Sequence, residues 1–458
     1  MKHYLILTAL LVLAAGVRLY RINAPLADWH SWRQADTAAV TRRYVQEGID
    51  LLRPRYDDLS SIPSGRDNPQ GYRMVEFPFV NALTAWLYGL FSPPLEIHVF
   101  SRLVSIMFSL GSLVFLYLLI HRLSDSLTAT LAAVTFTLLP YNIYFSRTIL
   151  PEVPLVFFSL GMLYFSVRNQ ILLATIFAAL ALLLKPYALF LFLPVAYWAF
   201  RHRRYTYLLL LLAVIPLLLW RFWIQQFPEG IPAFTWLLNG NGIRFKGAWF
   251  RWLFADRLGR LILGYFGLIP FGLGMLVKPE AKAGWFYHFW LLGILAYLAV
   301  FATGNVQHDY YQIIAIPIIS IFVAQGLAFL LKPPAEFSKL ICNLAFIICN
   351  LFILAFGWYH VRDYFNINHP EIVAAGQAAD KLLPPDAKVI APYQGDTAFL
   401  YQTNRRGWPI GGDINTKINL GATHYVTTTF DDEAKTLVRQ YQIIKQTNSF
   451  IIIDLTGQ

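Results

Sequence analysis

Long runs of apolar residues recur from the amino terminus to about residue 357, and they constrain the fold of this chain more than any other feature. A helix that crosses the hydrocarbon core of a bilayer needs about 20 mostly apolar residues. The composition agrees, because 57% of the 458 residues are hydrophobic and 14% are charged, whereas soluble proteins contain about 25% charged residues. The sequence therefore predicts a polytopic, all-α membrane protein.

Hydropathy predicts about eleven transmembrane helices, and the basic residues of the short loops predict their orientation. The loops at "RHRR" (201–204), "KPEAK" (278–282) and "KPPAEFSK" (332–339) fall on one side, which the positive-inside rule makes cytoplasmic. We interpret the first apolar segment as a retained span, because no convincing cleavage site of a signal peptide follows it. The predicted spans are 4–20, 97–120, 126–144, 153–167, 171–184, 187–200, 206–222, 260–277, 285–302, 311–331 and 339–358.

One further apolar segment, "FPFVNALTAWLYGLF" (77–91), is too short to count as a span. It ends at "SPP", and a span here would place the basic "RHRR" loop outside the cell. We therefore expect an interfacial or re-entrant helix on the extracytoplasmic side.

An odd number of spans places the carboxy-terminal tail on the extracytoplasmic side. In this tail "PEIVAAGQAADKLLPP" predicts an amphipathic helix, "AKVIAP" and "HYVTTT" predict strands, and "YQIIKQTNSFIIIDL" predicts a hairpin with "NS" at its turn. We expect a transmembrane catalytic domain over residues 1–360, with a first extracytoplasmic loop at about 21–96. A small α/β domain follows over residues 361–458.

Unusual polar residues gather at the extracytoplasmic ends of the spans, while the middles of the spans are nearly free of charge. Each residue alone has a plain explanation, such as a helix cap, a snorkelling lysine or an aromatic of the interfacial belt. Together, however, they come from at least five loops on one face, and a mixture of carboxylates and cations there suits an anionic, lipid-linked substrate. The candidates are Asp28, His30, Arg33, Asp36, Glu76, Arg147, Glu152, Lys185, His308, Asp309, Tyr310 and Tyr311.

The charge distribution argues against a nucleic-acid-binding protein, and the cysteine spacing argues against a disulfide within one helix. The formal net charge is +11, which in a membrane protein reflects cytoplasmic anchoring loops. No basic stripe marks a soluble domain, so we do not expect nucleic acid as a partner. Cys342 and Cys349 are seven residues apart in one predicted span, too far apart for a disulfide within that helix.

Four segments, "DWHSWRQADTAAV", "VEFPFVNALTAWLYGLF", "YFSRTILPEVPLVFF" and "HDYYQIIAIP", resemble the bacterial branch of the GT-C membrane glycosyltransferases. These enzymes are relatives of the protein O-mannosyltransferases and of the lipid A aminoarabinose transferase. The resemblance covers roughly residues 15–360. It implies an inverting transfer of a sugar from undecaprenyl or dolichyl phosphate to a lipid, glycan or protein acceptor, at the outer face of the bacterial cytoplasmic membrane.

The resemblance also implies roles for individual residues. An acid just after the first span acts as the base, and Asp28 matches it. The mannosyltransferases carry Asp-Glu there, whereas this chain has Asp28-Trp29-His30, so Asp36 or His30 also fits that role. Glu152 matches a second acid that is typical of the family.

The remaining candidates are expected to bind substrate. Phosphate is already a good leaving group, so the single displacement requires neither a general acid nor a metal, although a divalent cation is possible. The resemblance implies phosphate contacts at Arg33, Arg147 and Lys185, and donor-site contacts at His308 and Tyr311.

Two alternatives stay open. A related enzyme that transfers an oligosaccharide or a polymer would use a divalent cation, for which Asp28, Asp36 and Glu152 are the available acids. A transporter of lipid-linked saccharides is the other alternative. Transporters typically show internal repeats and ionisable groups near the middle of the membrane, whereas here the polar residues gather on one side.

Overall fold

The structure is a computed structural model that describes residues 2–457, with side chains from residue 5 onward. It divides into two compact units, which we describe separately. We call Met1–Ile22, Leu103–Arg221 and Phe234–Tyr364 the bundle unit. We call Asn23–Arg102, Phe222–Ala233 and Phe365–Gln458 the loop–tail unit, because it combines the first loop with the carboxy-terminal tail.

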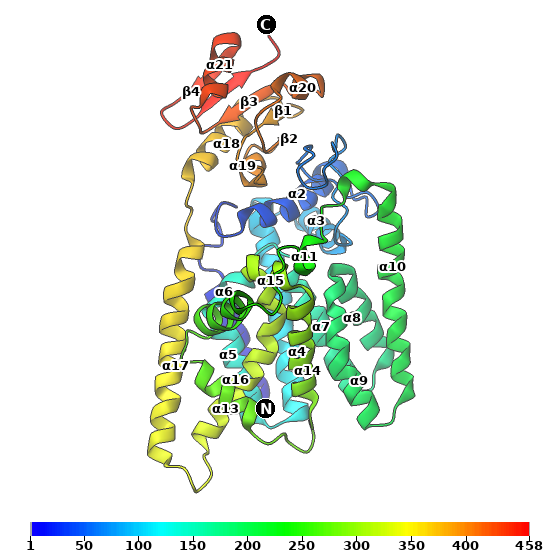
Figure 1. Ribbon diagram of the computed structural model, residues 1–458, viewed down its shortest axis with the longest axis vertical. Coiled ribbons are helices and arrows are strands. Elements are labelled where there is room, and N and C mark those ends of the chain that lie inside the picture. Colours follow the sequence, from blue (N-terminus) through cyan, green and yellow to red (C-terminus); the bar gives the residue numbers. More distant parts are fainter. Residues whose placement is uncertain (1, 458) are drawn as a thin grey trace. The chain divides into compact units, whose positions relative to one another are not determined.

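Helices make up the regular structure of the bundle unit in the part of the chain that the structure describes (Figure 1). The first turns of α4 belong to the loop–tail unit. The helices are α1 (Lys2–Arg18), α4 (Ile97–Leu123), α5 (Ser126–Leu138), α6 (Pro140–Phe145), α7 (Glu152–Val167), α8 (Ile171–Leu184), η1 (Pro186–Leu191), α9 (Phe192–Arg201), η2 (Tyr205–Ala213), α10 (Val214–Trp223), α11 (Trp236–Asn239), α12 (Gly247–Phe250), η5 (Arg251–Ile262), α13 (Leu268–Leu276), α14 (Phe286–Val300), α15 (Ala302–Gln307), η6 (Asp309–Ala315), α16 (Ile316–Leu331) and α17 (Lys339–Val361).

The protein is mostly helical, with several apolar spans, as predicted. Among the described residues, four helical segments are long and apolar enough to cross a membrane, and shorter apolar helices accompany them. The long segments are Ile97–Leu123, Tyr205–Gln226, Asp309–Leu331 and Lys339–Leu382.

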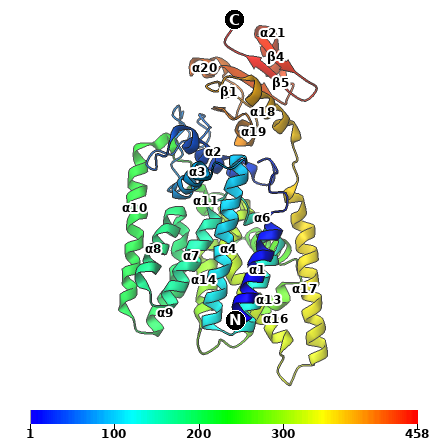
Figure 2. The ribbon, with the colours of Figure 1, turned by 180° about the vertical axis from the view of Figure 1, so that it is seen from behind.

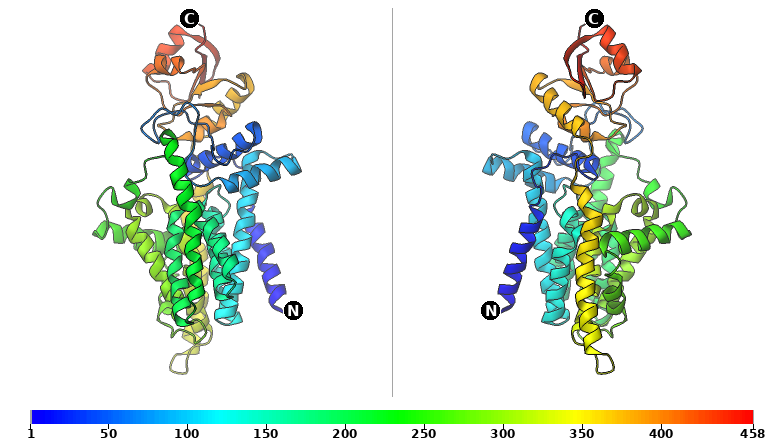
Figure 3. Two further views of the ribbon diagram at one scale, coloured as in Figure 1. Left: turned by 90° about the vertical axis from the view of Figure 1, so that its right-hand side faces the viewer. Right: turned by 90° about the vertical axis from the view of Figure 1, so that its left-hand side faces the viewer.

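The predicted span at 260–277 is not continuous. Helix η5 ends at Ile262, and the chain turns through Gly264 and Tyr265, both at positive φ, before α13 begins. The segment before the turn is also helical, as α11, α12 and η5, whereas the sequence predicted a loop. Residues 236–262 project sideways from the other helices of the bundle unit (Figure 3).

The closest helix packing in the bundle unit joins α13 to α16. A Cβ added at Gly274 of α13 would lie 1.8 Å from the carbonyl oxygen of Phe322, and one added at Gly326 of α16 would lie 1.8 Å from that of Pro270. Glycine at these positions lets the two backbones touch, which is the usual solution for packing helices inside a membrane.

The loop–tail unit combines helices with a mixed five-stranded sheet of order β2-β1-β3-β5-β4 (Figure 2). Strands β2, β1 and β3 run parallel, and β5 pairs antiparallel with both β3 and β4. Its elements are α2 (Ser31–Glu47), α3 (Phe79–Phe91), η3 (Ile224–Gln226), η4 (Pro228–Gly230), α18 (Pro370–Leu382), β1 (Lys388–Ile390), α19 (Thr397–Gln402), β2 (Arg406–Trp408), α20 (Ile414–Asn419), β3 (His424–Thr427), α21 (Asp432–Gln440), β4 (Gln442–Gln446) and β5 (Ile451–Asp454). A short helix, η7 (Arg362–Phe365), precedes α18.

Helices cover both faces of strands β1, β3 and β5, whose alternate residues point to opposite sides, whereas the edge strand β4 is exposed. Val389, Val426 and Ile452 pack with α18 and α19 on one face, whereas Ile390 and Tyr425 pack with α21 on the other. The predicted amphipathic helix, both predicted strands and the hairpin are confirmed. Strand β2 was not predicted.

A segment of the first loop extends this sheet beyond β2. Asp58 forms a parallel bridge with Gly407, whose N–H donates to the carbonyl of Asp57 at 2.9 Å, while the N–H of Leu59 donates to the carbonyl of Gly407 at 2.8 Å. A Cβ at Gly407 would lie 1.7 Å from the carbonyl oxygen of Val389. The first loop and the tail therefore share one hydrogen-bonded sheet.

Candidate active site

The carboxylate of Asp28 is buried and held through both oxygens. A turn at residues 28–31, with His30 at φ 53°, precedes α2, so that Asp28 lies outside the helix and does not cap it. The Gln34 amide donates to Oδ1 at 3.0 Å, and the Arg102 guanidinium donates to Oδ2 at 3.2 Å. Neither Gln34 nor Arg102 is exposed. This geometry fixes the orientation of the carboxylate that the sequence predicted as the base.

A second predicted acid, Asp36, lies on α2 and is also held through both oxygens. Thr397 donates to Oδ1 at 2.7 Å, and Arg73 forms an ion pair with Oδ2 at 2.8 Å. One turn earlier on the same helix, Arg33 pairs with Glu76. Glu76 directly precedes the segment 77–91 that was predicted as an interfacial helix, but α3 begins only at Phe79, and Glu76 pairs with a cation of α2.

These two ion pairs line a small pocket, partly open to solvent, between α2, α3 and the intervening loop. Two residues of this pocket, Arg73 and Asn81, were not predicted from the sequence. The Asn81 amide is held by the carbonyl of Thr37 at 2.8 Å and by the Thr41 hydroxyl at 3.0 Å. Paired charges and amides of this kind suit a polyhydroxylated ligand, because each presents hydrogen-bonding atoms in a fixed direction.

Two further buried acids lie in the electrostatic field of Asp36. Burial raises the pKa of Asp58 to about 7, and the charge of Asp36 adds to the shift. Burial likewise raises the pKa of Asp396 to about 6, again with a contribution from Asp36. Asp57, by contrast, has a lowered pKa although it is buried, because Arg42 and Arg43 both bind it. The pKa values of two adjacent acids in the first loop are thus shifted in opposite directions.

In the bundle unit, Glu152 and Lys185 form a buried ion pair. Glu152 is the first residue of α7 and Lys185 follows the last residue of α8, and the two side chains meet at 3.2 Å. The Tyr187 hydroxyl donates to the same carboxylate oxygen, Oε1, at 3.1 Å. The other oxygen, Oε2, is buried without a hydrogen-bond partner among the described residues. Buried polar atoms normally have a partner, so Oε2 is a candidate for a substrate hydroxyl.

The other predicted residues of the bundle unit lie in two places. Arg147 is fully buried, donates to the carbonyl of Arg21 at 3.0 Å and stacks over the ring of Tyr144. The rings of His308, Tyr310 and Tyr311 contact one another, with centroids 4.7 to 5.8 Å apart. Between them in the sequence, Asp309 accepts a hydrogen bond of 2.6 Å from the Tyr364 hydroxyl.

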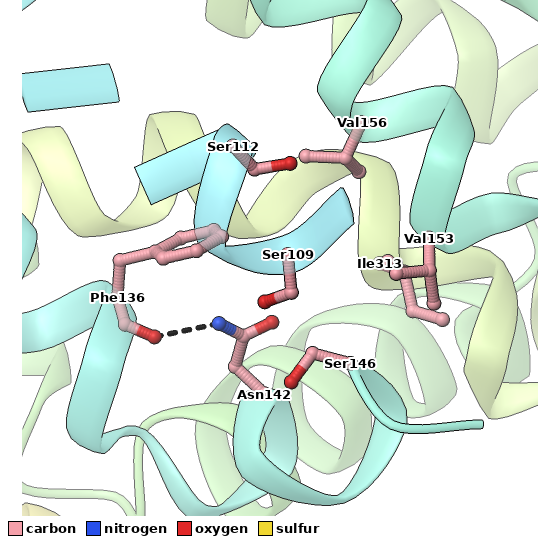
Figure 4. Close-up of a pocket in the computed structure, with 8 residues that line it drawn as sticks. All are labelled: Ser109, Ser112, Phe136, Asn142, Ser146, Val153, Val156 and Ile313. Carbon is pink, nitrogen blue, oxygen red and sulfur yellow. Dashed lines mark hydrogen bonds between the residues drawn. The ribbon is translucent and has the colours of Figure 1, made fainter. Parts of the chain in front are cut away.

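A small pocket of mixed polar and apolar lining in the bundle unit was not predicted (Figure 4). Ser109, Ser146 and Asn142 line it, together with apolar residues that include Val153. The guanidinium Nε of Arg18, at the end of α1, donates to the hydroxyls of Ser109 and Ser146, at 3.2 and 2.6 Å. An arginine at the end of an otherwise apolar span was the available sequence signal.

The acidic residues were also candidates for holding a divalent cation. Among residues 2–457, no group of three or more His, Cys, Asp or Glu side chains is arranged to hold a metal ion. The acids proposed for a divalent cation instead bind arginine, lysine, amide or hydroxyl groups, as Asp28 and Glu152 show.

Comparison with solved structures identifies the architecture. ArnT from Cupriavidus metallidurans bound to undecaprenyl phosphate matches with a TM-score of 0.66 at 13% identity, covering 98% of this chain and 97% of that one. Its apo state matches with a TM-score of 0.67 at 12% identity. The archaeal oligosaccharyltransferase AglB from Archaeoglobus fulgidus, in complex with an inhibitory peptide and a dolichol-phosphate, matches with a TM-score of 0.54 at 11% identity, covering 93% of this chain and 69% of that one.

The chain has a GT-C fold. No protein-family model and no curated protein matches the sequence. The match with ArnT covers nearly the whole chain, and so includes the tail. The predicted resemblance is therefore confirmed at the level of the fold.

Proposed function

We propose that this protein is a glycosyltransferase that transfers a sugar from a polyprenyl-phosphate donor to a lipid, glycan or protein acceptor at the outer face of a bacterial cytoplasmic membrane. The observation that carries the proposal is the nearly full-length structural match to ArnT, which was solved with undecaprenyl phosphate bound. The apolar helices support a substrate with a polyprenyl chain, because such a chain partitions into the membrane.

In the proposed reaction, Asp28 accepts the proton of the acceptor hydroxyl. The hydroxyl oxygen attacks the anomeric carbon as the bond to the phosphate oxygen breaks, so that configuration inverts and polyprenyl phosphate leaves with the electron pair. Asp28 suits this task because Gln34 and Arg102 fix the orientation of its carboxylate.

The phosphate carries the charge that grows in the transition state, and cations stabilise it. We propose Arg33, Arg147 and Lys185 as these cations. In the structure Arg33 and Lys185 each bind a carboxylate, which keeps a buried cation paired. We further propose that Oε2 of Glu152 accepts a hydroxyl of the transferred sugar.

The pocket between α2 and α3 supplies hydrogen bonds for recognition. We propose that Asp36, Arg73 and Asn81 orient hydroxyl groups of a substrate there, because their side chains are held in place by Thr397, Asp36 and Thr41 respectively. In this proposal Asp36 affects substrate affinity, whereas Asp28 affects the chemical step.

Transfer assays with the purified, full-length protein in lipid test the proposal. Radiolabelled polyprenyl-phosphate sugars serve as donors, and a membrane extract serves as the source of acceptors. We expect transfer by the unmodified chain and a loss of kcat of about 100-fold or more in Asp28→Asn, the size of a general-base contribution. Asp67→Asn, which changes an exposed acid of the same loop, is the matched control. Full activity in Asp28→Asn would refute the assignment of the base.

The structural match to AglB favours one second candidate, the transfer of a whole oligosaccharide. This function predicts activity with a lipid-linked oligosaccharide, and not with a single-sugar donor. A chelator added to both assays adds a second criterion, because only a metal-dependent transferase would lose activity. Turnover of a single-sugar donor in the presence of the chelator would exclude the second candidate.

A further inference from the structure

The short helix α19 of the tail binds the first loop through side chains from both of its ends. Gln402 donates to the carbonyl of Leu26 at 3.0 Å, two residues before Asp28. The guanidinium of Arg42, on α2, lies 4.0 Å from the ring centroid of Tyr401 and donates to the carbonyl of the same residue. The tail is therefore in direct contact with the segment that carries Asp28 and Asp36.

Thr397, the first residue of α19, makes the contact that matters most for the pocket. Its hydroxyl lies 2.7 Å from Oδ1 of Asp36 and 3.1 Å from the carbonyl oxygen of Trp32. Both hydroxyl contacts are buried or nearly so. The hydroxyl carries one proton, so the two acceptors share it.

This contact defines the plane of the Asp36 carboxylate. Thr397 fixes Oδ1 and Arg73 fixes Oδ2, so that rotation about the last side-chain bond of Asp36 breaks at least one of the two interactions. The orientation of Arg73 depends on the same carboxylate, and both residues line the pocket between α2 and α3. Removing one hydroxyl from the tail would therefore loosen two polar groups of the pocket.

We propose that Thr397 is a positioning residue for Asp36, and that the tail thereby shapes the substrate pocket of the first loop. The inference rests on the proposed glycosyltransferase function and adds a specific task for the tail. Thr397 does not touch the substrate in this proposal. It acts through Asp36, and this gives it a signature that a purely structural residue lacks.

The test is a double-mutant cycle on the full-length protein in lipid, with the donor KM, kcat and thermal midpoint measured for each variant. Thr397→Val removes the hydroxyl at nearly constant volume, and we expect it to raise KM roughly three- to tenfold, the effect of one hydrogen bond. We expect little change in kcat. Thr397→Ser retains the hydroxyl and should restore KM. In the Asp36→Ala background, which removes the acceptor of the Thr397 hydroxyl, Thr397→Val should cause no further change, because residues that act as a unit are non-additive.

Thr436→Val is the matched control, because this exposed threonine lies in α21 of the same sheet domain and binds only its own helix. If Thr397→Val fails to fold, Thr397→Ala removes the same hydroxyl with a smaller side chain. An unchanged KM in a folded variant, or full additivity with Asp36→Ala, would overturn the inference. Absence of any transfer by the unmodified chain would instead contradict the proposed function.

Discussion

The two units of this protein bury polar groups in different ways. In the bundle unit the buried charges are isolated from one another: Arg18 binds hydroxyl and carbonyl oxygens, and Glu152 pairs with Lys185. In the loop–tail unit, buried charges form clusters, and Asp57 alone binds both Arg42 and Arg43. The difference indicates that helix packing holds the bundle unit together. In the loop–tail unit, by contrast, polar contacts join the first loop to the tail.

The largest effect is expected in the loop–tail unit, when the acid that binds two arginines is removed. Asp57→Asn removes the charge that compensates Arg42 and Arg43, and all three side chains are largely buried. Leaving buried charges without a partner costs about 3–5 kcal/mol. We expect a matching fall in the thermal unfolding midpoint and earlier proteolysis of the tail.

Asp50→Asn is the control for this prediction. Asp50 forms a half-exposed ion pair with Arg53 at 3.5 Å, and exposed pairs contribute at most about 1 kcal/mol. Equal thermal midpoints for the Asp57 and Asp50 variants would show that the cluster does not hold the loop–tail unit together.

The second prediction concerns the bundle unit, where close helix packing takes the place of such clusters. Gly274→Ala places a methyl group against the backbone of α16, and we expect a loss of about 1–3 kcal/mol. Gly272→Ala, two residues earlier on α13, meets no atom within 4 Å. It should stabilise the helix by about 0.5–1 kcal/mol.

Thermal midpoints of both glycine variants in the same detergent measure this contrast. Opposite shifts for the two positions would support close packing of α13 on α16. Similar shifts would show that the helices separate easily, and that packing at this crossing contributes little to the stability of the bundle.

Local sequence patterns predicted the parts of the fold that depend on local physics. The apolar runs marked the helices of the bundle, and the alternation around "NS" marked the hairpin of β4 and β5, because burial against lipid or against a sheet face leaves a regular pattern. The break at Gly264 and Tyr265 lay inside an apolar run. Hydropathy therefore could not detect it.

The candidate site depends instead on contacts between distant residues. The sequence identified Asp28 and Asp36 as unusual, but it could not show that Arg102 binds the former or that Thr397, 361 positions away, binds the latter. Strand β2 was not predicted because one of its three residues is a glycine, which is not typical of a strand. The structure explains the glycine, because it allows β2 to lie close to β1. Asp57 and Asp58 are adjacent and identical in type, so only their partners distinguish them.

The last prediction concerns the pH dependence that distinguishes Asp58 from Asp57. Burial raises the pKa of Asp58 from 3.8 to about 7, so the folded protein keeps a proton that the unfolded chain loses as the pH rises above about 4. Stability therefore falls from about pH 4 to about pH 7 and is constant above that range. Over one pH unit in this window, the expected loss is about 1 kcal/mol.

Asp58→Asn isolates the effect of this titration, because it removes the ionisable group while keeping an oxygen that accepts the Ser60 N–H. We expect the thermal midpoint of the unmodified protein to fall more steeply between about pH 5 and about pH 6 than that of the variant. Asp67→Asn, at an exposed site of the same loop, should leave the slope unchanged. Parallel pH profiles for the unmodified protein and Asp58→Asn would mean that Asp58 is ionised throughout, and that a second cation compensates it as Arg42 and Arg43 compensate Asp57.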